Sequence, residues 1–337
     1  MRFQDNKMNG VMAELDSKLL KEVDSELMPI LTSVPAWDPK IGIRDIDEIR
    51  RISQERSAGA PKYANIVPKG ATIEYNGHKI RVLIYAPETT KTDLPCLVWF
   101  HGGGYVMGRA EDNWFPTFFA AKLDCIVLSV DYRLAPEYPA PAGIIDGYVA
   151  LNWVAESAEQ LGIDPKRIGI GGLSAGGGIA AAVALYNRDK GGAQPCLQLL
   201  LYPMLDYQHD TPSGRKEGYP IWSRKNSIAA WKLYLGEKPD EETVSFASPS
   251  HALHLEGLPA AYIAVGAVDL FLDENRYYAE KLRNAGVACE FHSFPGVFHA
   301  GEAAGYETKV GREMNMSHLA ALSKAFFLNS IDRITEF

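Results

Sequence analysis

The chain has 337 residues, of which 47% are hydrophobic and 23% are charged. These proportions are typical of a soluble globular protein, and the length favours one large domain with additions over two independent domains. The 42 acidic residues outnumber the 34 basic ones and give a formal net charge of -8, which argues against nucleic acid or an anionic membrane as the main partner.

Residues 1–62 mix charged residues with leucines at helical spacing and contain no apolar core of a signal peptide. We therefore expect helices here, and we expect neither secretion nor a membrane span. The cysteines are far apart, and each lies in or beside an apolar run: Cys96, Cys125, Cys196 and Cys289. They predict reduced, buried thiols. The lack of a signal-peptide core in residues 1–62 predicts a cytoplasmic location. A zinc site is not expected, because neither cysteines nor histidines cluster at ligand spacing.

An apolar run over residues 94–100 predicts a buried strand, and it leads directly into His101-Gly102-Gly103-Gly104. Three glycines after a strand allow backbone N–H groups to turn inward. The H-G-G-G pattern is typical of the loop that supplies one half of an oxyanion hole in lipases and esterases. Taken alone, the same stretch fits an ordinary turn at the end of a strand equally well.

Strands and helices then alternate through the middle of the chain. We expect strands over residues 125–130, 167–171 and 197–201, with helices around 147–158 and after residue 175. Such alternation predicts an α/β fold whose mostly parallel sheet is covered by helices on both faces.

Between the strand at 167–171 and an alanine-rich helical stretch lies Gly172-Leu173-Ser174-Ala175-Gly176. Strand, turn and helix are the context that a G-x-S-x-G nucleophile elbow requires. The turn holds its serine in a strained conformation, and the glycines on either side remove the side chains that would collide. The pattern makes Ser174 the candidate nucleophile and the amide of Ala175 the second half of an oxyanion hole.

The alternative for this stretch is a glycine-rich phosphate loop. A dinucleotide fingerprint would need a third glycine where Ser174 stands, and a P-loop would need G-K-[ST], which is absent. The H-G-G-G stretch lies upstream of Ser174 in the order that the hydrolytic motif requires, so we favour the nucleophile elbow.

Residues 206–250 interrupt the alternation. They contain Trp222, Trp231 and Tyr234 together with a helical pattern over 226–235. For each aromatic side chain, packing onto the core is a simpler expectation than contact with a substrate.

A serine nucleophile needs a base and an acid that orients it, in the chain order serine, acid, histidine. Asp269 follows the apolar run 260–266 and therefore lies on a loop at the carboxyl end of a predicted strand, where open parallel sheets place their sites. The rival is Asp273, which lies with Glu274 at the expected start of a helix, where an acid is already explained by the helix dipole.

His299 is the candidate base. It follows residues 294–298, an expected strand that breaks at a Pro-Gly turn and leaves a histidine on a loop. His292 fits a sheet position and His318 a helix face. The remaining histidines precede Asp269 and fall outside the chain order: His78, His101, His209, His251 and His254.

These blocks, in this order, resemble the hormone-sensitive-lipase-like branch of the α/β-hydrolases, which includes many bacterial carboxylesterases. The resemblance runs from about Tyr63 onward and includes Asp131-Tyr132-Arg133-Leu134-Ala135-Pro136-Glu137 and Pro139-Ala140-Pro141-Ala142. It implies the α/β-hydrolase fold, the triad Ser174, Asp269 and His299, and oxyanion amides at Gly103, Gly104 and Ala175. One departure is Leu173, which stands where members of the family commonly carry an acid.

The resemblance also implies the domain organisation. Residues 63–205 and 251–337 would form the catalytic core. Residues 1–62 would be an N-terminal helical cap segment, and residues 206–250 an inserted cap segment.

The implied function is a serine carboxylesterase that hydrolyses short-acyl esters, from acetyl to hexanoyl, through a covalent acyl-enzyme and without a cofactor or metal. Its partner would be a small-molecule ester, and the sequence leaves a homo-oligomer open. Two alternatives remain. An amidase or formamidase would use the same triad, and a non-catalytic ligand receptor, known on this fold in plants, is disfavoured because all three triad residues are present.

Overall fold

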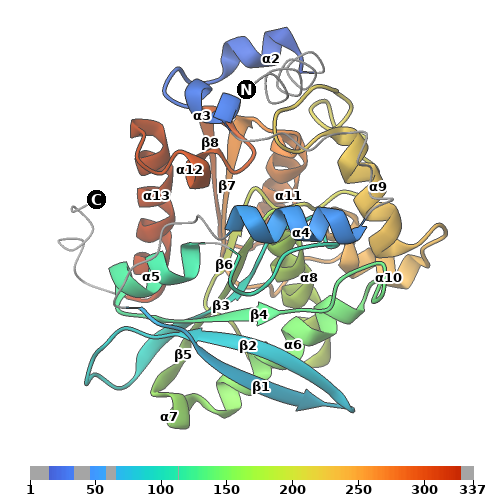
Figure 1. Ribbon diagram of the computed structural model, residues 1–337. Coiled ribbons are helices and arrows are strands. Elements are labelled where there is room, and N and C mark those ends of the chain that lie inside the picture. Colours follow the sequence, from blue (N-terminus) through green and yellow to red (C-terminus); the bar gives the residue numbers. More distant parts are fainter. Residues whose placement is uncertain (1–14, 34–45, 58–65, 113, 328–337) are drawn as a thin grey trace.

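The computed structural model describes residues 15–33, 46–57, 66–112 and 114–327 (Figure 1). Its strands form one 8-stranded sheet in the order β1-β2-β4-β3-β5-β6-β7-β8. The strands are β1 (Lys69–Tyr75), β2 (His78–Tyr85), β3 (Leu94–Phe100), β4 (Ile126–Asp131), β5 (Ile163–Leu173), β6 (Gln198–Leu201), β7 (Ala261–Val268) and β8 (Cys289–Phe298). From β4 across to β8 every neighbouring pair is parallel, which confirms the predicted α/β class.

Helices cover both faces of the sheet (Figure 1). On one face α5 packs against α13, and on the other α6 packs against α8, with α11 beside β7 and β8. The helices are α2 (Ser17–Glu22), α3 (Met28–Ser33), α4 (Ile46–Ser57), α5 (Phe115–Leu123), α6 (Ala142–Glu156), α7 (Ala158–Leu161), α8 (Ala175–Lys190), α9 (Arg224–Leu235), α10 (Glu241–Ala247), α11 (Leu272–Asn284), α12 (Gly301–Ala304) and α13 (Lys309–Ala325). A short 3-10 helix, η2, spans Pro249–His251.

The centre of the sheet explains the apolar runs in the sequence. Every residue of β3 is buried, because helices cover both faces and β4 and β5 flank it in register. The helix after β5 is rich in alanine, which has a high helix propensity, and it ends at Gly191 in a left-handed conformation. These two elements hold the H-G-G-G loop and the elbow at the same edge of the sheet.

Several boundaries differ from the expected ones. The expected helix at 147–158 begins earlier, at Ala142, and the strand at 167–171 begins at Ile163. The first two strands form an antiparallel hairpin that the sequence analysis did not include. Its signal is the pair Asn76-Gly77, since both residues have positive φ, at 47° and 79°, as the tight hairpin turn requires.

The expected break at Pro295-Gly296 is wrong, because β8 continues through both residues to Phe298. The register shifts between Gly266 and Val268 of the neighbouring strand, and this irregularity accommodates the extra residues. β8 is an edge strand, where a proline that cannot donate a hydrogen bond to the ladder is tolerated.

Three helices lie in the N-terminal part that was expected to be helical, α2, α3 and α4, while residues 1–14, 34–45 and 58–62 lie outside the described residues. α2 and α3 lie above the β7–β8 edge of the sheet (Figure 1). The Asp16 amide donates to the Gly218 carbonyl, so the N-terminal segment contacts the 206–250 insert directly. The division into core and cap segments stays a prediction.

Cys96 and Cys125 are buried free thiols, as expected. Cys196 and Cys289 are also free, but the expectation of full burial is wrong for them: both are half-buried, Cys196 just before β6 and Cys289 at the start of the edge strand β8. Among the described residues, no helix is both long and apolar enough to cross a membrane.

Candidate active site

Ser174 lies between the last residue of β5 and the first residue of α8, with φ 54° and ψ -122°. This is a strained conformation for a residue with a side chain. The turn is so tight that a Cβ on Gly172 would lie 2.4 Å from the Gly176 carbonyl oxygen, and one on Gly176 would lie 2.1 Å from that of Phe100. Glycine is therefore required on both sides of the serine for steric reasons.

Asp269, His299 and Ser174 form a continuous chain of side-chain contacts. Nδ1 of His299 lies 2.8 Å from Oδ2 of Asp269, and Nε2 of His299 lies 3.0 Å from Oγ of Ser174. Each of the three residues directly follows a strand, namely β7, β8 and β5. The carboxyl ends of these parallel strands meet at one edge of the sheet, and this is what brings three residues so far apart in sequence together.

The three side chains are largely withdrawn from solvent, since Asp269 is 0% exposed, Ser174 5% and His299 6%. One oxygen of Asp269 contacts the imidazole, and the other accepts a hydrogen bond from the Phe271 amide at 3.0 Å. The carboxylate is thus held at both oxygens, and it fixes the orientation of the imidazole.

The rival acid, Asp273, has different partners. Its Oδ2 accepts a hydrogen bond from the Ser213 amide at 2.8 Å, and its Oδ1 pairs with Arg276 at 3.0 Å. The Asp273 amide donates in return to the Ser213 hydroxyl oxygen at 3.0 Å. Asp273 therefore ties the start of α11 to the 206–250 insert and makes no contact of this kind with His299.

Two aromatic rings that the sequence analysis did not single out lie against the imidazole of His299. Tyr202, just after β6, meets it edge to face at 5.0 Å, and Phe271, just before α11, does so at 5.3 Å. Both rings come from the carboxyl ends of neighbouring strands. A sequence signal for Tyr202 exists in its place directly after a buried strand, the same rule that identified Asp269.

The H-G-G-G loop turns directly after β3. Gly103 and Gly104 have φ of 122° and 59°, in the region that favours glycine. A Cβ on Gly103 would lie 2.2 Å from the Met107 carbonyl oxygen, and one on Gly104 would lie 2.5 Å from the Trp222 ring. The indole of Trp222, from the insert, thus lies directly over Gly104.

The amides of this loop are available for a ligand. Among the described residues, the N–H groups of Gly103 and Gly104 donate no hydrogen bond. Ala175 is the first residue of α8, where an N–H has no acceptor within its own helix. The helix dipole adds partial positive charge at that end.

Leu173 packs against the H-G-G-G loop. A Cβ built on Gly102 would lie 2.5 Å from its Cδ1 atom, so the leucine side chain already contacts this loop. Leu173 therefore makes an apolar contact between the elbow and the H-G-G-G loop.

His101 has a structural place in the loop. It is buried and stacked on Tyr132 at 4.3 Å, and its Nδ1 lies 2.8 Å from the Gly102 carbonyl oxygen. Burial lowers the pKa of this imidazole, so the ring is held neutral.

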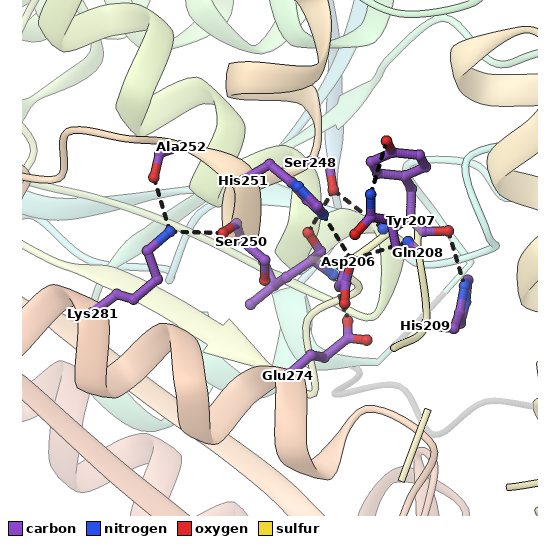
Figure 2. Close-up of polar contacts among 11 residues, drawn as sticks. Asp206, Tyr207, Gln208, His209, Ser248, Ser250, His251, Ala252, Glu274 and Lys281 are labelled. Carbon is purple, nitrogen blue, oxygen red and sulfur yellow. Dashed lines mark hydrogen bonds and ion pairs between the residues drawn. The ribbon is translucent and has the colours of Figure 1, made fainter. Parts of the chain in front are cut away.

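The insert begins and ends at one polar cluster (Figure 2). Glu274 of α11 accepts hydrogen bonds from the amides of Leu205 and Asp206, at 2.7 and 3.2 Å. At the other end of the insert, Ser248 donates to the Leu205 carbonyl, and His251 Nε2 lies 2.8 Å from Asp206 Oδ1. Asp273 and Glu274 therefore both anchor the insert to the helix that follows Asp269.

Within the described part of the chain, no group of three or more His, Cys, Asp or Glu side chains has the arrangement of a metal site.

Comparison with known proteins identifies the family of the chain. Residues 97–302 match the model of the family described as "alpha/beta hydrolase fold". Esterase LipI of Mycobacterium tuberculosis is 36% identical over 281 residues, which cover 82% of this chain and 87% of the relative. Carboxylesterase NlhH of the same species is 37% identical over 259 residues, which cover 75% and 81%.

Solved structures give the same result. A bacterial heroin esterase superposes with a TM-score of 0.85 at 34% identity, over 91% of this chain and 99% of that one. Esterase LipW from Mycobacterium marinum superposes with a TM-score of 0.82 at 29% identity, over 94% and 99%. The chain belongs to the hormone-sensitive-lipase-like family of carboxylic ester hydrolases within the α/β-hydrolase fold.

Proposed function

We propose that the protein is a serine carboxylesterase in which Ser174 is the nucleophile, His299 the general base and Asp269 the residue that orients the base. The observation that carries this proposal is the continuous contact from Asp269 through His299 to Ser174, at 2.8 and 3.0 Å. The 3.0 Å distance allows proton transfer from Ser174 to His299. The 2.8 Å distance allows Asp269 to fix the tautomer of His299.

In the first half-reaction, Nε2 of His299 takes the proton of the Ser174 hydroxyl as Oγ attacks the ester carbonyl carbon. The amides of Gly103, Gly104 and Ala175 stabilise the oxyanion, and the imidazolium then gives its proton to the departing alcohol. In the second half-reaction, water attacks the acyl-enzyme with His299 again as base. The carboxylic acid leaves, and Ser174 regains its proton. No step requires a metal or a cofactor.

We further propose that the N-terminal segment and the insert act as a cap that limits the substrate to short acyl chains, from acetyl to hexanoyl. The contact of Trp222 with Gly104 supports this size limit, because the indole of the insert occupies space directly beside the proposed oxyanion amides. The low exposure of Ser174, at 5%, points the same way. The cytoplasmic location and the oligomeric state stay predictions.

The proposal is tested by Ser174→Ala. We expect kcat/KM for p-nitrophenyl acetate to fall by about 10³-fold or more, with an unchanged circular dichroism spectrum and Tm, because only oxyanion stabilisation and binding would remain. Retention of more than about a tenth of the activity would rule out Ser174 as the nucleophile. Extending the ester series in acyl length tests the cap, since a maximum beyond about ten carbons would show a pocket far longer than proposed.

An amidase using the same triad is the second candidate. This candidate is worth testing because one relative, from Bos taurus, is named arylacetamide deacetylase. That relative is 29% identical over 313 residues. Turnover of one aryl ester and of its matched anilide decides between the two activities. We expect the ester to be the better substrate, because an alcohol is a better leaving group than an amine.

A further inference from the structure

A carboxyl group that the proposed mechanism does not use lies close to His299. Glu302 follows the base by three positions, in the short helix α12, and its side chain is fully buried. Both of its carboxyl oxygens lack a hydrogen-bond partner among the described residues. A buried carboxyl without full hydrogen bonding is costly to maintain, and in a native protein it calls for a functional explanation.

The groups around Glu302 come from the neighbouring elements of the core. Oε1 lies 4.0 Å from Nε2 of His318 on α13, and Asn315 of α13 donates to the Glu302 backbone carbonyl. The hydroxyl of Tyr202, after β6, interacts with the carboxyl in a geometry short of an ideal hydrogen bond. The ring of the same tyrosine meets His299 edge to face at 5.0 Å. Tyr202 thus contacts both the buried carboxyl and the imidazole.

Only one of the groups that act on Glu302 can become positively charged during the reaction. Burial lowers the pKa of His318 to about 3, so that imidazole stays neutral. Burial also keeps the hydroxyl of Tyr202 neutral, since it raises the pKa of that group far above neutral pH. The charged or titratable groups that act on Glu302 are Tyr202, Tyr262, Asp269, His299 and His318. Of these groups, only His299 becomes positively charged in the proposed mechanism, and its charge favours the ionised form of Glu302.

We propose that Glu302 is a positioning residue for His299: its carboxylate, held beside the Tyr202 hydroxyl, attracts the imidazolium that forms when Ser174 gives up its proton. This inference rests on the proposed function, and it gives the base a second carboxylate besides Asp269. The attraction acts across a buried region, where a charge is poorly screened and has a large effect.

The protonation state of Glu302 makes this arrangement dependent on pH. Burial raises the pKa of the Glu302 carboxyl to about 7, while Tyr202 and the charge of His299 act in the opposite direction. The carboxyl is thus neutral in weak acid and becomes ionised as the pH rises through about 7. Ionised Glu302 stabilises the imidazolium and neutral Glu302 does not, so kcat gains as Glu302 ionises.

The kinetic test compares Glu302→Gln with Glu307→Gln, a carboxyl-to-amide change at an exposed position on the same segment. We expect Glu302→Gln to lower kcat at pH 8 by about three- to tenfold and by less at pH 6, with KM unchanged, which corresponds to about half to one pK unit of interaction. The acid limb of its kcat–pH profile should be shallower than that of the wild type. The Glu307→Gln enzyme should follow the wild-type profile.

Tyr202→Phe keeps the ring on His299 and removes the hydroxyl. Because the hydroxyl favours ionised Glu302, the acid limb should move to higher pH in this variant. Combining it with Glu302→Gln should give the profile of Glu302→Gln alone, since the effect passes through the carboxyl. A shift of the same size in both backgrounds would contradict the proposal and assign Tyr202 an independent role.

Stability provides the readout that separates positioning from packing. A carboxyl whose pKa is raised in the folded state binds its proton more tightly there than in the unfolded chain. The contribution of Glu302 to the stability of the wild type should therefore decline as the pH rises from about 4.5 to about 7. Glu302→Gln cannot ionise and should escape this decline, so at pH 8 it should unfold at a urea concentration no lower than the wild type while being less active.

A Glu302→Gln enzyme with the wild-type pH profile, or one whose activity falls only in proportion to lost stability, would overturn the inference. Ser174→Ala fails or succeeds independently of these results, because it tests the nucleophile and not the titration of Glu302. If Ser174→Ala stays active, the proposed function is wrong. If only the Glu302 profile is unchanged, the triad stands without a second carboxylate.

Discussion

The nucleophile elbow and the segments above it are held in place by different physical means. At the elbow, β5 and α8 approach the end of β3 so closely that a single Cβ on Gly176 would lie 2.1 Å from a backbone oxygen. The N-terminal segment and the insert are instead attached by side-chain contacts, such as the hydrogen bonds of Arg50 and Asp273 and the contact of Trp222 with Gly104. The reacting serine is thus placed by backbone sterics that tolerate no change, whereas the segments around the substrate are attached by side-chain contacts that can be exchanged one at a time.

The acid that orients the base gives the largest expected effect. Asp269→Asn should reduce kcat by about 10⁴-fold, because an amide fixes the wrong tautomer of the imidazole. Asp273→Asn is its matched control: it should cost less than about tenfold, since it alters only the attachment of the insert through Ser213 and Arg276. Steady-state kinetics on one ester measures both. A reversed order of the two variants would exchange the roles assigned to the two aspartates.

The steric account of the elbow predicts the next largest effect. Gly176→Ala should destabilise the protein by about 3 kcal/mol or more and abolish most activity, because the new methyl group meets the backbone oxygens of Phe100 and His101 at 2.1 and 2.3 Å. The control is Gly169→Ala in β5, where the nearest atoms lie 3.5 Å away. Urea unfolding should show a change below about 1 kcal/mol there. Equal losses at both positions would contradict the assignment of the strain to the elbow.

The smallest effect is expected at Arg50, which attaches α4 to the core. Its guanidinium donates to the carbonyls of Val106 and Ala135 and pairs with Glu137. Arg50→Ala should cost about 1–2 kcal/mol and change kcat/KM no more than a few-fold. Arg51 pairs only within α4 among the described residues, with Glu48 and Glu55, so Arg51→Ala should be neutral. A loss of activity at Arg50 as large as that at Asp269 would show that α4 takes part in the chemistry.

The sequence identifies the residues whose placement depends on local rules. The elbow and the H-G-G-G loop are recognisable because glycine spacing after an apolar strand specifies the turn. Asp269 and His299 follow from chain order and from the rule that sites gather at the carboxyl ends of parallel strands. These local signals also account for the correct prediction of β3 and of the α/β class.

Tertiary packing decides the features that the sequence analysis missed. Glu302 has the pattern of an ordinary acid in the first turn of a helix, and only the packing of α12 beside α13 and Tyr202 buries it. Glu274 likewise has the pattern of an acid at the start of a helix. Only the folded structure shows that the amides of Leu205 and Asp206 donate to it. The continuation of β8 through Pro295 depends on its place at the edge of the sheet, which no local pattern shows.

The central claim is that Ser174 forms the covalent bond to the acyl group. The most direct measurement is the site of modification by a p-nitrophenyl alkylphosphonate, mapped by mass spectrometry of proteolytic peptides, because the phosphonyl adduct of a serine hydrolase is stable where an acyl-enzyme is not. We predict a single adduct on Ser174 that forms in proportion to the loss of esterase activity and is absent from Ser174→Ala. Inactivation without an adduct on Ser174, or with the adduct on another residue, would contradict the claim.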